Sequence, residues 1–100
     1  MTQQALPAEH ETDLVGQWVN KGRKVVGDDT AKRIEWLVGQ HLVLLGSDAS
    51  GWDDLYRDPL TGKLWELSWP QSERHGGGPP RLTQIGLDVA RGKYGAPADG

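Results

Sequence analysis

The sequence predicts an α+β fold: a largely antiparallel sheet packed against one main helix, with a short C-terminal helix. Three observations predict it: one segment with the apolar period of a helix, a strong hairpin signal, and several short runs typical of strands. A chain of 100 residues has room for one small core, so we expect a single domain over residues 13–95. Residues 1–12 and 96–100 are polar without a period, which predicts flexible tails.

The first elements form a hairpin and then a helix start. Residues 14–20 and 23–26 are typical of two strands, and Lys21-Gly22 marks the turn between them. Asp28 and Asp29 follow as helix-capping residues, placed where the helix dipole favours negative charge.

The clearest helix is predicted over residues 30–42. Its apolar stripe falls at helical spacing on Ile34, Leu37, Val38, His41 and Leu42. Gly39 weakens this helix by roughly 1 kcal/mol relative to alanine. We expect His41 to be a core-edge or surface histidine.

A second hairpin follows a short strand over residues 43–46. Residues 52–57 and 63–69 flank a turn in which Pro59 presets φ and Gly62 takes the left-handed position. Alternation along the second strand places three side chains on one face, which we expect to be the core face: Trp65, Leu67 and Trp69.

The rest of the chain predicts a long loop, a strand and a helix. Residues 70–80 form the loop, and residues 81–85 form a final strand that buries Leu82. Residues 87–94 form a short helix that ends at Gly95.

Composition excludes several function classes. The net charge of −3 argues against a nucleic-acid partner, which selects a basic surface. The chain has no cysteine, and no apolar run approaches the roughly 20 residues of a membrane helix. The N-terminus has neither a basic start nor an apolar stretch, so we expect no signal peptide, no membrane partner and a cytoplasmic location.

Catalysis and metal binding have little support. The three histidines lie far apart in sequence and match no zinc spacing, so we expect no metal and no cofactor. Ser72, Glu73 and His75 in the long loop suggest a hydrolase only if they converge in space. We expect no enzyme, and we interpret this loop as a recognition loop.

The strongest binding signal is a run of acids interleaved with aromatic residues. Residues 48–58 contain four acids and a single basic residue, Arg57. The acids are Asp48, Asp53, Asp54 and Asp58, and the aromatic residues Trp52 and Tyr56 lie between them. Aromatic side chains anchor interfaces and acids steer a basic partner. The alternative is a solvated hairpin whose aspartates cap turns, and Asp58 before Pro59 fits that role best.

Motifs distributed along the chain resemble one family. They are Leu-Val-Gly-x-Trp-Val at 14–19, Arg-Ile-Glu-Trp-Leu at 33–37, Gly-Trp-x-x-Leu-Tyr at 51–56, Asp-Pro-x-x-Gly-Lys at 58–63, Leu-Trp-Glu-Leu at 64–67, Trp-Pro-x-Ser-Glu at 69–73 and His-Gly-Gly-Gly-Pro-Pro at 75–80. In this order and spacing they are similar to immunity protein family 27, over about residues 13–95.

The resemblance implies an antitoxin that binds and neutralises a cognate toxin of a bacterial polymorphic toxin system, commonly a nuclease. A toxin-binding surface over residues 48–58, helped by Glu73 and His75, would suit a basic toxin. The alternative is a small peptide- or metabolite-binding module, with an apolar pocket beneath Trp52, Trp65 and the glycine loop.

Overall fold

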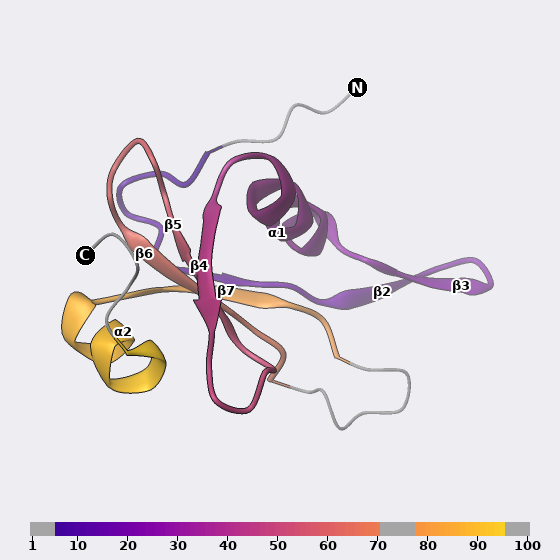
Figure 1. Cartoon of the computed structure of the whole chain (residues 1–100). Helices are drawn as coiled ribbons and strands as arrows, with labels where there is room; N and C mark the ends of the chain where they lie inside the picture. The colour runs from indigo at the N-terminus through magenta and orange to yellow at the C-terminus, as the bar shows by residue number, and fades with distance from the viewer. Residues whose placement is uncertain (1–5, 71–77, 96–100) are drawn as a thin grey trace.

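The computed structural model describes residues 6–70 and 78–95, and these form an α+β domain (Figure 1). The elements in chain order are β1 (Asp13–Val15), β2 (Trp18–Lys21), β3 (Lys24–Gly27), α1 (Asp29–Gln40), β4 (Val43–Ser47), β5 (Asp54–Arg57), β6 (Leu64–Ser68), β7 (Arg81–Ile85) and α2 (Leu87–Tyr94). The predicted fold class is confirmed. Residues 1–5 and 96–100 of the predicted tails, and residues 71–77 of the predicted loop, lie outside the described residues.

The main sheet has five antiparallel strands in the order β1-β7-β6-β5-β4. β2 and β3 pair only with each other and form a separate two-stranded sheet. In the ribbon view this hairpin extends away from the rest of the domain (Figure 1). Both pairings predicted as hairpins, β2 with β3 and β5 with β6, are therefore present.

The expectation of one continuous strand over residues 14–20 is wrong. The chain divides at Gly16 and Gln17, so that β1 joins the main sheet and β2 joins the hairpin. Gly16 donates its N–H to Pro80 O at 2.8 Å, and Gln17 O accepts from Asp28 N–H at 2.9 Å. A Cβ at Gly16 would lie 2.7 Å from that Pro80 oxygen, so the close approach of the two segments requires glycine.

Helix α1 begins at a side-chain cap and buries one stripe. Asp28 is the N-cap, and its Oδ1 accepts from Ala31 N–H at 2.8 Å. Ala31, Ile34 and Leu37 are buried at helical spacing. The helix ends at Gln40, two residues earlier than expected, because Leu42 N–H bonds back to Leu37 O as the chain turns into β4.

The core lies between α1 and one face of the main sheet. Trp65 and Leu67 are buried there and Trp69 packs against them, which confirms the face predicted from alternation. The buried cluster consists of Leu14, Ile34, Leu37, Leu42, Tyr56, Trp65, Leu67 and Leu82. It draws on α1 and on strands from across the sheet, so it fixes the main helix over the central strands.

The opposite face of the sheet is covered by α2. Leu55 lies directly across from Glu66, on the face away from Trp65, and Leu55 is buried. Ala90 in the middle of α2 is also buried, and Tyr94 Oη donates to Glu66 Oε2 at 2.7 Å. The two helices therefore lie on opposite sides of the sheet, as Figure 1 shows.

Strand β4 forms one edge of the main sheet and contains a bulge. Leu44 pairs with Tyr56 and Gly46 pairs with Leu55, so Leu45 is an extra residue with no partner in the register. β4 is followed by the segment that carries the acidic residues, and the bulge sits just before it.

Neither described helix is both long enough and apolar enough to cross a membrane.

Candidate functional site: the acidic loop

Residues 48–53, which we call the acidic loop, connect β4 to β5 and are organised by the Asp48 carboxylate. Its Oδ1 accepts from Ser50 Oγ at 2.7 Å, Gly51 N–H at 3.0 Å and Asp53 N–H at 3.3 Å. Backbone bonds close the loop as well, because Asp48 N–H donates to Asp53 O at 2.9 Å. Gly51 has a φ of +79°, a conformation that glycine adopts without strain. The loop is thus held in one shape by its own side chains.

The same contacts keep Asp48 charged. The hydrogen bond from the Ser50 hydroxyl lowers the pKa of the Asp48 carboxyl, and the N–H groups of Asp53 and Gly51 act in the same direction. These donors are all neutral, and the ammonium of Lys93 lowers the pKa of Asp48 by a smaller amount than they do. The loop therefore presents a full negative charge at neutral pH.

Trp52 lies in this loop and exposes 66% of its surface. The sequence predicted a strand that began at Trp52, but β5 begins only at Asp54. The hydrogen bonds of Asp48 to Gly51 and Asp53 bend the chain through these positions and delay the strand. As a result, Trp52 extends from a loop with a fixed backbone instead of alternating within the sheet.

Asp53 and Asp54 have different partners. Asp53 Oδ2 lies 2.6 Å from Lys93 Nζ, and the same ammonium lies 2.7 Å from Glu66 Oε2. Asp54 Oδ1 accepts from the Ser47 hydroxyl. One lysine is therefore shared by two carboxylates, while Asp54 contacts a neutral hydroxyl group.

Lys93 and Tyr94 complete the site, although no sequence pattern indicated them. Burial opposes the charge of Lys93, but its bonds to Asp53 and Glu66 outweigh that effect and raise its pKa. Burial, together with the nearby Glu66 carboxylate, raises the pKa of Tyr94. The end of α2 is thus fixed beside the acidic loop by charge pairing. Sequence reasoning missed this because 40 positions separate Asp53 from Lys93.

Two other predicted site residues are buried. Tyr56 belongs to the core, directly across from Trp65. Asp58 is 3% exposed, and its Oδ1 accepts from Leu60 N–H at 2.8 Å and lies 2.9 Å from His41 Nε2. Asp58 therefore has the turn role that the sequence also suggested. The structure brings together Asp48, Trp52, Asp53 and Asp54, whereas Glu73 and His75 lie outside the described residues.

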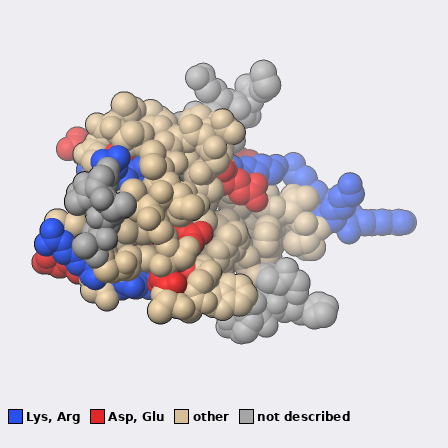
Figure 2. Space-filling view, in the orientation of Figure 1, with Lys and Arg blue, Asp and Glu red and all other residues tan. Residues whose placement is uncertain are grey.

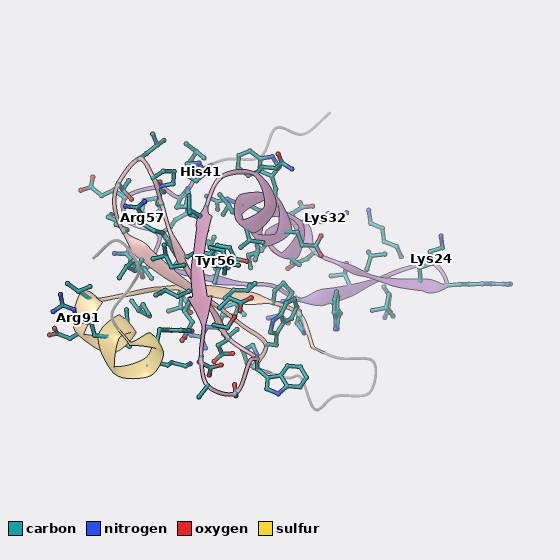
Figure 3. All side chains as sticks on the ribbon, in the orientation of Figure 1. Lys24, Lys32, His41, Tyr56, Arg57 and Arg91 are labelled. Carbon is teal, nitrogen blue, oxygen red and sulfur yellow. The ribbon has the colours of Figure 1, made fainter. Side chains whose placement is uncertain are left out.

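The side-chain view places His41, Tyr56 and Arg57 close to the ribbon of α1 and the sheet, away from the hairpin that carries Lys24 (Figure 3).

Within residues 6–70 and 78–95, no group of three or more histidine, aspartate or glutamate side chains is arranged to hold a metal ion. The Ser72, Glu73 and His75 group of the hydrolase alternative falls in the segment that the structure does not describe.

One cavity bears on the alternative of a small-ligand module. It has a volume of about 300 Å³, at the lower end of the range for ligand sites. Its lining consists of Pro7, Ala8, Glu9, Asp58, Thr61, Lys63 and Trp65. Trp52 does not line it, and charged side chains make up part of the wall, so it differs from the apolar pocket expected beneath Trp52 and Trp65.

Comparison with known proteins gives one match. A family model described as "Immunity protein 27" matches residues 20–86. This range includes most of the first hairpin and every element from α1 to β7, with the acidic loop between β4 and β5. A search of curated proteins and a search of solved structures found no match.

Proposed function

The chain belongs to the immunity protein 27 family, and we propose that it binds and neutralises a cognate toxin of a bacterial polymorphic toxin system by direct protein–protein contact. In this proposal the toxin acts in the cytoplasm, where the immunity protein meets it. The protein inhibits the toxin by binding to it and catalyses no reaction itself. We further propose that the acidic loop, with Asp54 beside it, is the toxin-binding surface.

The exposure of Trp52 on a rigid loop is the observation that carries this proposal. An aromatic side chain buries a large area in a partner at low entropic cost, and such residues dominate binding energy in interfaces. The contacts of Asp48 hold the loop in shape before any partner arrives. Little conformational entropy would therefore be lost when Trp52 inserts into a pocket on the toxin.

The charge around Trp52 favours a basic toxin. Asp48 and Asp54 accept hydrogen bonds from neutral hydroxyl groups, whereas Lys93 is shared between Asp53 and Glu66. The site thus has an excess of negative charge. A nuclease has a basic groove for phosphates, and carboxylates on a rigid loop suit that groove. We propose a nuclease as the toxin on this ground.

The test uses the toxin encoded beside this gene. Purified toxin would be titrated with the full chain in a calorimeter, and cells expressing the toxin would be scored for rescue. Trp52→Ala should weaken binding by at least about tenfold, as for an interface anchor. Leu60→Ala is the matched control, because Leu60 is also an exposed apolar residue (72% exposed) but lies in the turn between β5 and β6.

Each outcome decides a separate part of the proposal. No heat of binding and no rescue by the wild-type chain would remove the toxin-inhibitor function. Binding that Trp52→Ala and Leu60→Ala leave equally strong would place the interface outside the acidic loop. Binding to a toxin whose activity is not on nucleic acid would remove the nuclease assignment alone.

A further inference from the structure

Residues 18–27, which we call the basic arm, form the hairpin of β2 and β3 that extends from the domain (Figures 1 and 3). All four residues of β2 are exposed, and Val25 in β3 is 63% exposed. Gly22 has a φ of +63° in the first central position of the turn, as a two-residue hairpin turn of type II′ requires. The arm therefore has a defined shape but contributes few side chains to the core.

The charge of the arm is opposite to that of the chain. Lys21, Arg23 and Lys24 give it three positive charges and it contains no acid, so the other residues of a chain of net −3 carry −6. The space-filling view shows basic side chains concentrated on the hairpin tip (Figure 2). Among the described residues, none of these three cations forms an ion pair.

The two lysines lie directly across from each other. Lys21 pairs with Lys24 in the register of β2 and β3, on either side of the turn that carries Arg23. Like charges at directly opposite positions destabilise an antiparallel pair. The fold gains nothing from this arrangement, whereas a carboxylate placed between the two ammonium groups would relieve it.

The backbone of the arm is also open to a further strand. In a hairpin with a two-residue turn, the residues that flank the turn exchange hydrogen bonds, and the next pair directs its N–H and C=O groups outward. Here that next pair is Asn20 and Val25. Neither β2 nor β3 has a second strand partner within the described residues. Each edge of the arm therefore offers unpaired backbone groups.

We propose that the basic arm binds an acidic, extended segment of a partner protein, whether or not that protein is the toxin, by adding it as a strand to one edge. The carboxylates of that segment would lie between Lys21, Arg23 and Lys24. Exposed valines at positions 19 and 25 provide apolar contact that a nucleic-acid backbone does not use. A second copy fits less well, because the arms of two copies carry the same positive charge and repel each other.

The test follows amide chemical shifts of residues 18–27 in the full chain during titration with a peptide of alternating glutamate and valine. The acidic peptide should shift these amides, and added salt should weaken its binding. The variant K21Q/R23Q/K24Q should lose about tenfold in affinity. The variant K32Q/K63Q/R91Q removes the same charge from the main body and should bind as the wild type does.

Two further variants test strand addition. Asn20→Pro and Val25→Pro each remove an outward N–H from one edge, a position where proline is tolerated. One of the two should abolish the shifts while the dispersed spectrum of the hairpin persists. Retained binding in both variants, or no binding of the peptide to the wild type, overturns the proposal. Equal binding of a charge-matched oligonucleotide, or self-association through the arm in sedimentation, overturns it in favour of those partners.

Discussion

His41 Nε2 lies 2.9 Å from Asp58 Oδ1, and this hydrogen bond joins the C-cap of α1 to the turn between β5 and β6. Both side chains are largely removed from solvent. The same Asp58 oxygen accepts from Leu60 N–H, while Asp58 O accepts from Gly62 N–H at 2.8 Å. A single aspartate thus shapes the turn and fastens it to the end of the main helix.

Replacing Asp58 with alanine should lower the free energy of unfolding by about 2 kcal/mol, because His41 and the Leu60 N–H would both lose a buried acceptor. Urea unfolding followed by tryptophan fluorescence measures the change. Asp58→Asn retains an acceptor oxygen and should cost about half as much. If alanine and asparagine are both tolerated within about 0.5 kcal/mol, the bond to His41 contributes nothing measurable.

Two tryptophans should respond in opposite ways to truncation. Trp65 is 1% exposed in the core, so Trp65→Ala should destabilise the fold by about 3–5 kcal/mol. Trp52→Ala should change stability by less than about 0.5 kcal/mol, since its side chain points into solvent. Thermal unfolding of the two variants compares them directly. A large loss for Trp52→Ala would mean that this side chain supports the fold and is not held ready for a partner.

Alanine substitutions at two glycines should change the free energy of unfolding in opposite directions. Gly16→Ala should destabilise by about 1–3 kcal/mol, because the new Cβ would meet Pro80 O at 2.7 Å and Ala31 Cβ at 3.0 Å. Gly39→Ala, in α1 with nothing within 4 Å of its Cβ, should stabilise by about 0.5–1 kcal/mol. Denaturant midpoints check both. Equal effects at the two positions would contradict the close approach of β1 to residue 80.

The ion pair of Glu11 with Arg33 should make stability depend on pH. The hydrogen bond from Arg33, with that from Ala8 N–H, lowers the pKa of Glu11 from 4.5 to about 2. The folded state therefore favours the charged form, and the stabilisation is complete above pH 4.5 and is lost as the pH falls towards about 2. For a pair near the surface we expect about 1 kcal/mol.

Glu11→Gln tests this pH dependence. The variant should be less stable than the wild type at neutral pH, and the difference should vanish towards pH 2. Urea midpoints at a series of pH values measure the effect. Parallel curves for the two proteins over this range would show that Glu11 has the same pKa in the folded and unfolded chain.

The elements predicted correctly from sequence were those with local causes. The stripe of Ile34 and Leu37 identified α1, and Pro59 with Gly62 identified the turn between β5 and β6. Alternation placed Trp65 and Leu67 on the core face. Each of these signals depends on residues within a few positions of one another, which is the range over which period and turn chemistry act.

The features that the sequence did not reveal depend on distant partners. The break between β1 and β2 arises from the contact of Gly16 with Pro80, and the burial of Asp58 depends on His41. In the candidate site, the interleaved acids and aromatics grouped Asp48 with Trp52, but the predicted strand began at Trp52, whereas the structure has both residues in the acidic loop. They gave no indication that Lys93 would return from α2 to neutralise part of that charge.

The extra residue Leu45 in β4 has a consequence for polymerisation at this border of the main sheet. Fibrils grow when a strand of another molecule can pair with an uninterrupted row of amide and carbonyl groups along an exposed sheet border. On β4 this row is interrupted at Leu45, which leaves two residues in regular register on either side of it. This border of the main sheet is therefore a poor template for polymerisation by added strands.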